Sequence, residues 1–245
     1  MDFTGQIAVV TGAARGIGRA TAQLFAQRGA RLALIDVDLE KLETVKEELS
    51  EYTKDVLIYK CDISDMEAVN STFSDILENY GKVDILINNA ALFRDYMPFM
   101  ESTPDRWKLY FDVNVMGTLY CTRCVIPSML ENGYGRIVNI GSVAGVYGNR
   151  FMTHYSGTKG AVIAMTSSLA KEYAQSGITV NCVSPGSVSP SAHDDVNYVQ
   201  HTDLAFMSRT GSGRENAELI AFVASKEASY ISGQNIQIDG CRKLL

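Results

Sequence analysis

Tyr155 and Lys159, four residues apart, have the side-chain types and spacing that most directly suggest chemistry in this sequence. On a helix, residues at this spacing project from the same face. A lysine ammonium close to a phenol stabilises the phenolate and lowers the pKa of the tyrosine from its reference value of about 10 toward a working pH. We therefore expect Tyr155 to act as a general acid/base at a carbonyl oxygen.

Ser142 closes the apolar segment Ile140-Gly141-Ser142, where its hydroxyl could donate a hydrogen bond to a substrate oxygen. A tyrosine and a lysine at this spacing also occur on ordinary surface helices. The position of Tyr155 and Lys159 after a strand-terminal serine favours the catalytic interpretation over that alternative.

A glycine-rich turn near the N-terminus has the context that a dinucleotide-binding site requires. The apolar run Ile7 to Val10 leads into Thr11-Gly-Ala-Ala-Arg-Gly-Ile-Gly18 and then into a helical pattern. Gly12 allows a tight turn, Gly16 lets the backbone approach a pyrophosphate, and Gly18 lets the helix pack close to the strand. Amides at the start of the helix would face the anion, so an ordinary loop is the weaker interpretation.

Asp36 ends the second apolar run, about twenty residues after the glycines. A carboxylate there can accept hydrogen bonds from the adenosine ribose hydroxyls and would repel a 2′-phosphate. Neither Val37 nor Asp38 is basic. Asp36 therefore favours NAD(H) over NADP(H), although the guanidinium of Arg15 in the glycine turn could contact a 2′-phosphate.

The elements that must position these groups alternate along the chain. Seven short apolar runs predict strands at residues 7–10, 32–35, 56–59, 83–87, 136–140, 178–183 and 235–238. Segments with helical periodicity predict helices at 17–28, 39–51, 66–79, 105–131, 155–175 and 214–224. Strands that are nearly continuous in apolar character are typical of a parallel sheet covered on both faces. The predicted fold class is therefore α/β, a doubly wound parallel sheet flanked by helices.

The same pattern indicates a single domain over residues 1–245, because no linker, repeat or low-complexity block interrupts it. The least regular stretch, 186–213, is expected to be a substrate-binding loop or lid. Asp62-Ile-Ser64 and Ser102-Thr-Pro104 offer N-cap candidates before the third and fourth helices.

Composition narrows the possible functions. The hydrophobic content of 46% supports a full core, and the net charge of −6 argues against a nucleic-acid partner, which depends on clustered Lys and Arg. No apolar run reaches the roughly 20 residues of a membrane span, and no targeting segment is evident. The five cysteines follow neither a secreted-framework nor a metal-binding pattern, so we expect no metal site and a cytoplasmic protein.

Further motifs occur with these in one order over nearly the whole chain: Asn88-Asn-Ala90, Asn114, Pro185-Gly186 and Gln237-Ile-Asp-Gly240. On all of these motifs together, the sequence resembles the short-chain dehydrogenase/reductase family. The resemblance implies a Rossmann fold with a seven-stranded parallel sheet and a bound nicotinamide cofactor. It also implies hydride transfer at a carbon beside Tyr155, which interconverts a secondary alcohol and a ketone.

The resemblance also implies roles for individual residues. Tyr155 would be the general acid/base, Ser142 the donor to the substrate oxygen, and Lys159 both the modifier of the tyrosine pKa and a ligand of the nicotinamide ribose. Asn114 would hold a water in a proton relay from Lys159. The other implied cofactor contacts are Gly12, Arg15, Gly16, Ile17 and Gly18 at the pyrophosphate, Asp36 at the adenosine ribose, Asp62 and Ile63 at the adenine, Asn88 and Ala90 by the ribose, and Pro185, Gly186 and Val188 behind the nicotinamide.

Two positions depart from the family pattern. Ala91 follows Asn-Asn-Ala where the family often has Gly, and Pro190 stands where many relatives have a Thr whose hydroxyl bonds the cofactor. Pro190 cannot make that bond, so Ser189 or Ser191 could substitute for it.

The sequence does not distinguish among a hydroxysteroid, a sugar alcohol and a 3-oxoacyl thioester as the substrate. By analogy, the pocket is expected to draw on Leu92, Phe93, Arg94, Val143, Ala144, Tyr147, Arg150, Phe151, His154, His193 and Phe206. This mixture of aromatic and basic groups is compatible with an extended apolar substrate with an anionic end, and equally with a sugar or an acyl thioester. Arg94 and Arg150 could instead simply face water.

Rival interpretations come from two classes. A noncatalytic dinucleotide-binding regulatory protein is the alternative to an enzyme, and the complete set of catalytic side chains argues against it. An epimerase or dehydratase of the extended relatives would carry a large C-terminal substrate domain that is not found here. The resemblance also implies a homotetramer, or else a homodimer, paired through the helices that begin near Asp105 and Tyr155.

Overall fold

The computed structural model describes residues 1–93, 96–189 and 195–243. These residues form seven strands: β1 (Ile7–Thr11), β2 (Arg31–Asp36), β3 (Val56–Lys60), β4 (Ile85–Asn88), β5 (Gly135–Ile140), β6 (Ile178–Pro185) and β7 (Asn235–Ile238). All pairs are parallel, in the order β3-β2-β1-β4-β5-β6-β7. The prediction of a seven-stranded, doubly wound parallel sheet is confirmed, and the predicted strand ends differ from the observed ones by at most two residues.

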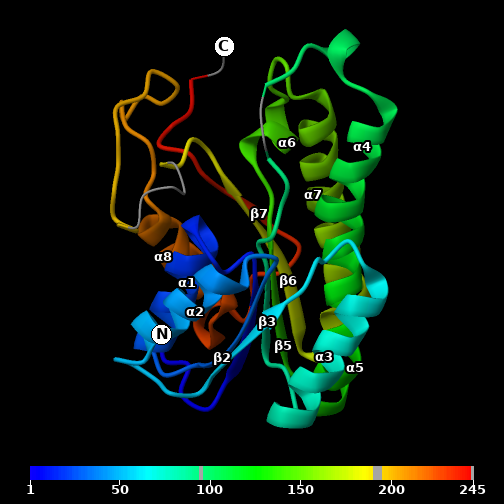
Figure 1. Ribbon diagram of the computed structural model, residues 1–245, viewed down its shortest axis with the longest axis vertical. Helices are drawn as coiled ribbons and strands as arrows, with labels where there is room; N and C mark the ends of the chain where they lie inside the picture. The colour runs from blue at the N-terminus through cyan, green and yellow to red at the C-terminus, as the bar shows by residue number, and fades with distance from the viewer. Residues whose placement is uncertain (94–95, 190–194, 244–245) are drawn as a thin grey trace.

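Helices cover both faces of the sheet (Figure 1). One face carries α1 (Gly16–Gln27), α2 (Leu39–Leu49) and α8 (Gly213–Ala224), and the other carries α3 (Met66–Tyr80), α4 (Pro104–Phe111), α5 (Gly117–Asn132) and α7 (Thr153–Tyr173). Along β1, Ala8 and Val10 pack into the first layer, whereas Ile7 and Val9 pack into the second. Because both faces are buried, the strand is apolar throughout.

Local capping sets several helix ends. Asp65 accepts the amide of Glu67 at the start of α3, and Gly81 ends that helix with a φ of +77°, which glycine adopts at little cost. Thr103 accepts the amide of Arg106 at the start of α4, within one of the two segments expected to provide a cap. Such N-caps contribute about 1 kcal/mol each.

The helix expected over 105–131 is present from Pro104 to Asn132, with a π-helical turn at Asp112–Met116 between α4 and α5. Two other expectations about local structure are wrong. The cap of α3 is Asp65, since Asp62 instead accepts the amide and the hydroxyl of Ser64. A short helix, α6 (Val143–Tyr147), stands where none was expected.

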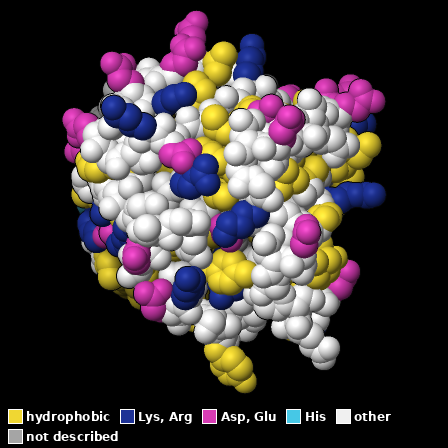
Figure 2. Space-filling view, turned by 90° about the horizontal axis from the view of Figure 1, so that it is seen from below, with side chains coloured by type: hydrophobic (Ala, Val, Ile, Leu, Met, Phe, Trp, Pro, Cys, Tyr) yellow, Lys and Arg dark blue, Asp and Glu magenta, His cyan; other side chains and the backbone are white. Residues whose placement is uncertain are grey.

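Figure 2 shows the molecule from below, the side opposite the loops that follow β5 and β6. Lys and Arg side chains are interspersed there with Asp and Glu. On that face the described residues form no extended basic stripe of the kind that binds a phosphate backbone. Within the described ranges, no helix is both long and apolar enough to cross a bilayer.

We predict that Gly18→Ala destabilises the protein, because a Cβ at residue 18 would lie 2.0 Å from the carbonyl oxygen of Gly12. The expected loss is about 3 kcal/mol of unfolding free energy, as for other overpacked sites. Gly157→Ala on α7 is the matched control, since its nearest new neighbour is Cζ of Phe111 at 3.8 Å. It should stabilise the helix by up to about 1 kcal/mol. Urea unfolding measures both, and equal effects would contradict the close packing at Gly18.

Candidate functional site

The carboxyl ends of the strands lie at one edge of the sheet because all strands are parallel (Figure 1). The glycine turn follows β1, Ser142 follows β5, and Pro185 ends β6. β1 lies between β2 and β4, so the connections on its two sides run in opposite directions. Doubly wound sheets bind ligands at such a point.

The turn after β1 permits close approach to its backbone. Gly12 has a φ of +65° and Gly16 a φ of +57°, and a Cβ on Gly12 would fall 2.7 Å from Cα of Ala90. Helix α1 begins with Arg15 as its N-cap residue, with no side-chain cap on its first amides and no acidic residue in its first turn. Ile17 is partly buried against the core. Uncapped amides at the positive end of a helix dipole suit a pyrophosphate.

Asn89 holds this turn in place, although the sequence analysis assigned it no role. Its Nδ2 donates to the carbonyl oxygens of Thr11 and Gly12, both at 2.9 Å. The hydroxyl oxygen of Thr11 accepts the amides of Asn89 and Ala90, both at 3.0 Å. The end of β4 is therefore cross-linked to the glycine turn, and the Asn-Asn-Ala motif was the signal that could have identified this contact.

Asp36, at the end of β2, reaches back to the same turn. Its Oδ2 accepts the amide of Ala14 at 3.0 Å, and its Oδ1 accepts the amide of Asp38 at 3.2 Å. Asp38 caps α2 and pairs with the ammonium of Lys41 at 2.8 Å. Hydrogen bonds from Lys41 lower the pKa of the Asp38 carboxyl, with a smaller contribution from the charge of Arg15. The carboxylates of Asp36 and Asp38 thus both lie where the adenosine ribose is expected, and Asp38 forms an ion pair with Lys41.

The segment after β3 lies beside Asp36, because the amide of Cys61 donates to the Asp36 carbonyl at 3.0 Å. Asp62 is exposed, and its side chain is used in the turn with Ser64. Ile63 is buried, and a Cβ on Gly117 would collide with it at 2.6 Å. Both residues expected at the adenine are therefore next to the residue expected at the adenosine ribose.

Asn88 directs its side chain into the protein. Its Nδ2 donates to the hydroxyl of Thr122 at 3.0 Å and to Oδ1 of Asn139 at 2.9 Å. Asn88 is 4% exposed, so its side chain belongs to the interior. The contact with the glycine turn is made by the nearby amide of Ala90, which donates to the hydroxyl of Thr11.

Ser142 and Tyr155 are brought together by the contact of α6 with α7. Ser142 caps α6 by accepting the amide of Ala144 at 3.1 Å. A Cβ on Gly145 would lie 2.6 Å from the carbonyl carbon of Lys159, so the two helices approach at the backbone. A hydrogen bond joins the side chains of Ser142 and Tyr155 and acts to lower the pKa of the phenol.

Lys159 is 3% exposed, and its Nζ donates to the carbonyl oxygen of Ile140 at 2.7 Å. The ammonium lies 5.9 Å from the centre of the Tyr155 ring. Burial lowers the pKa of Lys159 to about 8. Burial also raises the pKa of Tyr155 to about 12 despite the hydrogen bond with Ser142. The expectation that Lys159 lowers the tyrosine pKa is therefore wrong for this arrangement, because the ammonium is directed at Ile140 and desolvation of the phenol dominates.

Asn114 lies in the π-helical turn and is 1% exposed. Its Oδ1 accepts the amide of Leu92 at 2.6 Å, and its Nδ2 donates to the Leu92 carbonyl and to the hydroxyl of Thr158, both at 3.1 Å. Thr158 precedes Lys159 on α7. Asn114 therefore connects the segment after β4 to the catalytic helix, and π-helical turns often occur at functional sites.

The segment after β6 passes close to β7. Pro185 is buried, and a Cβ on Gly186 would lie 2.7 Å from Cβ of Asp239. Val188 forms a parallel bridge with Gly211. Pro185, Gly186 and Val188, the three residues expected behind the nicotinamide, therefore lie in one segment at the edge formed by the carboxyl ends of the strands, which we call the catalytic edge.

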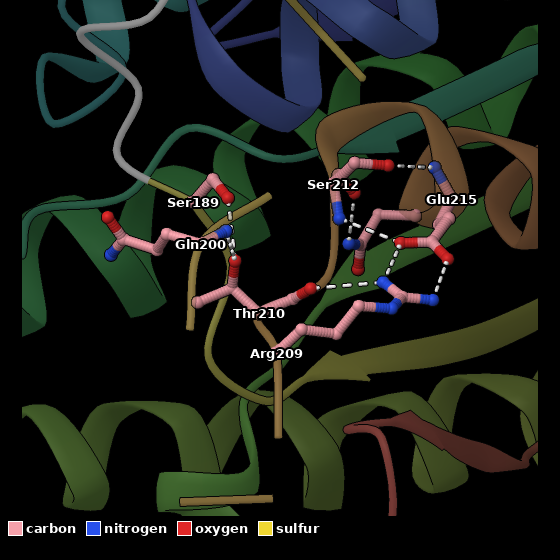
Figure 3. Close-up of polar contacts among 7 residues, drawn as sticks. Ser189, Gln200, Arg209, Thr210, Ser212 and Glu215 are labelled. Atoms are coloured by element: carbon pink, nitrogen blue, oxygen red, sulfur yellow. Dashed lines mark hydrogen bonds and ion pairs between the residues drawn. The ribbon is translucent and has the colours of Figure 1, made fainter. Parts of the chain in front are cut away.

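Hydrogen bonds and an ion pair connect the described parts of 186–213 to one another and to α8 (Figure 3). The hydroxyls of Ser189 and Thr210 lie 2.7 Å apart, and the Thr210 hydroxyl also accepts the amide of Gln200 at 3.0 Å. Arg209 makes a two-pronged pair with Glu215 of α8, at 2.7 and 2.9 Å. Bidentate pairs of this kind fix geometry as well as charge.

Several expected residues lie outside the described ranges: Arg94, Pro190, Ser191 and His193. Ser189, one of the two serines expected to replace the hydroxyl missing at Pro190, is bonded to Thr210.

The residues expected to line the substrate pocket separate into two groups. His154 is 6% exposed and packs edge-on against Tyr110 with ring centres 4.4 Å apart, so it belongs to the interior. Val143 and Ala144 are each 2% exposed. The exposed members are Phe93, Tyr147, Arg150, Phe151 and Phe206, and Leu92 is intermediate.

The residues at this edge of the sheet suit both ends of a nicotinamide dinucleotide. The uncapped amides of α1 and the carboxylate of Asp36 suit the adenosine diphosphate part, and Tyr155 and Lys159 lie farther along the same edge, after β5. Among the described residues, no group of His, Cys, Asp and Glu is arranged to hold a metal ion.

Comparisons with known sequences agree with this geometry. Residues 6–200 match the family described as short chain dehydrogenase. The 3-oxoacyl-(acyl-carrier-protein) reductase of Thermotoga maritima is 36% identical over 243 residues, which cover 98% of each chain. Nodulation protein G of Rhizobium meliloti is 34% identical over 242 residues, which cover 98% of this chain and 97% of that protein.

Two solved structures share the fold over almost the entire chain. An NAD+-bound xylitol dehydrogenase is 30% identical with a TM-score of 0.90, covering 98% of this chain and 100% of the other. A 3-ketoacyl-(acyl-carrier-protein) reductase from Brucella melitensis, in complex with NADH, is 30% identical with a TM-score of 0.89, covering 98% of each chain.

We predict that the stability of the wild-type protein, relative to Lys159→Met, rises as the pH increases from 8 toward 10.5. The folded-state pKa of Lys159 is about 8 and the ordinary value is 10.5. Between these values the unfolded chain binds more protons, so stability increases with pH. Below pH 8 both states are protonated, and the full penalty of the buried charge is present.

Urea unfolding of both proteins across this range measures the difference. Lys171→Met, an exposed position on the same helix, should track the wild type at every pH. A difference between wild type and Lys159→Met that does not vary with pH would contradict a desolvated ammonium at this position.

Proposed function

Because the chain belongs to the short chain dehydrogenase family, we propose that it is an NAD(H)-dependent oxidoreductase that interconverts a secondary alcohol and a ketone. The observation that carries this proposal is the meeting of Ser142, Tyr155 and Lys159 at the edge of the sheet that also bears the glycine turn. A protein that only bound a dinucleotide would have no use for a buried ammonium beside a hydrogen-bonded serine and tyrosine.

Each catalytic side chain has a distinct task in this proposal. When bound, the nicotinamide ring supplies or accepts the hydride. Ser142 donates a hydrogen bond to the substrate oxygen, while Tyr155 gives a proton to that oxygen or takes one from it. Lys159 would hold the nicotinamide ribose through its ammonium, which lies 5.9 Å from the centre of the Tyr155 ring. Asn114 acts as a positioning residue through the backbone of Leu92 and the helix of Lys159.

The raised pKa of Tyr155 favours its role as an acid. A phenol with a pKa of about 12 is protonated at neutral pH and ready to protonate a ketone oxygen during reduction. Oxidation of an alcohol requires that Tyr155 first lose its proton, which a higher pH favours. Oxidation of the alcohol should therefore depend on a high pH more strongly than reduction of the ketone does.

Two carboxylates support NAD(H) as the cofactor. Asp36 would accept hydrogen bonds from the ribose hydroxyls and repel a 2′-phosphate. Asp38 pairs with Lys41 and lies near Arg15, so it competes for the two cations that could otherwise attract that phosphate. The xylitol dehydrogenase and Brucella melitensis reductase structures hold NAD+ and NADH respectively.

The relatives suggest which substrates to test first. Their names point to 3-oxoacyl thioesters and to a sugar alcohol, and hydroxysteroids complete the panel. We further propose a cytoplasmic location, which the cysteine pattern favours, and a homotetramer or homodimer, as the family resemblance implies.

We predict that Tyr155→Phe loses turnover by about a hundred- to ten-thousand-fold, the usual contribution of a general acid/base. NADH binding, measured by nicotinamide fluorescence, should be retained because the adenosine end is untouched. The matched control is Tyr173→Phe at the far end of the same helix, which should be fully active. Substantial turnover by Tyr155→Phe, followed by nicotinamide absorbance over the substrate panel, would show that another group transfers the proton.

We predict that Asp36→Ala raises the ratio of kcat/KM with NADPH to kcat/KM with NADH by at least about tenfold, because a like charge opposite the 2′-phosphate is removed. Adding Asp38→Asn should raise the ratio further, since Lys41 and Arg15 lose their competing carboxylate. Asparagine is also a good N-cap, so α2 is preserved. If the ratio is unchanged in Asp36→Ala, the adenosine ribose does not bind at Asp36. If the double variant shows no further increase in the ratio, Asp38 does not contribute to cofactor preference.

A further inference from the structure

We propose that the residues at the start of α8 position the segment 186–189 for the nicotinamide end of the cofactor. The positioning residues are Thr210 and the ion pair of Arg209 with Glu215. They act through the backbone of 186–189 and not by contact with the cofactor. This inference rests on the proposed function, which places the nicotinamide ring in front of that segment.

The residues that precede α8 form a short ladder with the segment 186–189. Val188 and Gly211 form a parallel bridge. The amide of Gly211 donates to the carbonyl oxygen of Ser187 at 2.9 Å, and the amide of Ser189 donates to the carbonyl oxygen of Gly211 at 3.0 Å. Backbone hydrogen bonds on both sides of Val188 therefore fix this segment relative to Gly211.

Thr210 connects this ladder to a second segment on its other side. Its amide donates to the carbonyl oxygen of Gln200 at 2.8 Å, and its hydroxyl oxygen accepts the amide of Gln200 at 3.0 Å. The same hydroxyl lies 2.7 Å from the hydroxyl of Ser189 (Figure 3). Thr210 is 3% exposed, so water cannot readily replace these bonds. One buried hydroxyl thus holds the two flanking segments together.

The ion pair of Arg209 with Glu215 connects the ladder to α8 (Figure 3). The guanidinium donates to both carboxylate oxygens, at 2.7 and 2.9 Å, and to the carbonyl oxygen of Thr210 at 3.1 Å. Oε2 of Glu215 also accepts the amide of Ser212 at 2.9 Å. Hydrogen bonds from Arg209 lower the pKa of Glu215 to about 2, so the pair stays charged at neutral pH. One carboxylate of α8 therefore holds both Arg209 and Ser212.

The start of α8 also contacts the glycine turn. A Cβ on Gly213 would lie 3.4 Å from the carbonyl oxygen of Gly16 and 3.2 Å from Cβ of Ala20. The same helix start is thus next to the turn expected at the pyrophosphate and is connected to the segment expected behind the nicotinamide. The distance between the two ends of the cofactor site therefore depends on α8 and on the ladder that joins it to 186–189.

Ligand binding distinguishes a positioning role from a purely structural one. A residue that only stabilises the fold affects all ligands of the site alike, whereas a residue that positions 186–189 affects only ligands with a nicotinamide ring. ADP-ribose has the adenosine, the pyrophosphate and the second ribose of NADH but no nicotinamide. The ratio of the dissociation constants of ADP-ribose and NADH therefore separates the two roles.

Isothermal titration calorimetry of the full-length protein with NADH and with ADP-ribose measures both constants. We expect the wild type to bind NADH more tightly than ADP-ribose. Thr210→Val should weaken NADH binding about tenfold, because the Gln200 amide and the Ser189 hydroxyl lose their partner, and should leave ADP-ribose binding unchanged. Thr210→Ser keeps the hydroxyl and should retain the wild-type affinity for both ligands.

Glu215→Gln tests the ion pair separately. Glutamine can keep the capping box of α8, so the start of the helix is preserved. NADH binding should weaken about threefold, as for a partly exposed ion pair, while ADP-ribose binding is unchanged. The matched control is Glu218→Gln on the same helix, whose partner Arg28 lies at the far end of α1 from the glycine turn. This control should change neither affinity.

The outcomes also separate this inference from the proposed function, because turnover of the substrate panel is followed independently. If Thr210→Val weakens NADH and ADP-ribose alike, or weakens neither, the inference is wrong even when the wild type turns over a substrate. If it weakens NADH alone and the wild type turns over nothing, the inference holds and the proposed function is wrong. Equal affinity of the wild type for the two ligands also overturns the inference. If Thr210→Val does not fold, unchanged NADH binding by Glu215→Gln overturns it.

Discussion

The hydrogen bond from the buried ammonium of Lys159 to the carbonyl oxygen of Ile140 joins the catalytic helix α7 to the end of β5. A buried charge is tolerated only where it is hydrogen-bonded, and the lowered pKa of Lys159 shows that burial still disfavours it. The position of this ammonium depends on how closely α6 approaches α7. Gly145 makes that approach possible, because any side chain there would strike the backbone of α7. Ser142 and Tyr155 meet as a consequence.

Side-chain amides hold the rest of the catalytic edge. Below the edge, the strands are packed by apolar residues on both faces. At the edge, Asn89 fastens the glycine turn to β4, and Asn114 fastens the segment after β4 to α7. In the interior beneath them, Asn88 donates to Asn139, which donates in turn to Thr166 of α7. Hydrogen bonds between buried polar groups favour one geometry, because a broken bond would leave its donor or acceptor without a partner in the interior.

Much of this arrangement follows from the sequence. Continuous apolar runs predict the strands because both faces of the sheet are covered, and the glycine turn is predictable because Gly18 has no room for a Cβ. The inward direction of Asn88 could also have been deduced, since it points to the same face as Leu86, two residues earlier on β4. These features depend on local sterics and on the period of a strand.

Other features depend on contacts between distant segments. The π-helical turn at Asn114 follows from bonds to Leu92 and Thr158, which no helical periodicity encodes. The pKa of Tyr155 was misjudged because a spacing of four residues shows that two side chains share a helix face, but not where the ammonium points. The ammonium and its acceptor, Ile140, are nineteen residues apart in the chain.

A crystal structure of the protein in complex with NADH tests the central claim most directly. We predict that the adenosine ribose hydroxyls bind the carboxylate of Asp36, that the pyrophosphate lies against the first amides of α1, and that the nicotinamide ribose lies within hydrogen-bond distance of Nζ of Lys159. A nicotinamide ring far from Tyr155 and Lys159, with the dinucleotide bound along some other part of the sheet edge, would contradict the account.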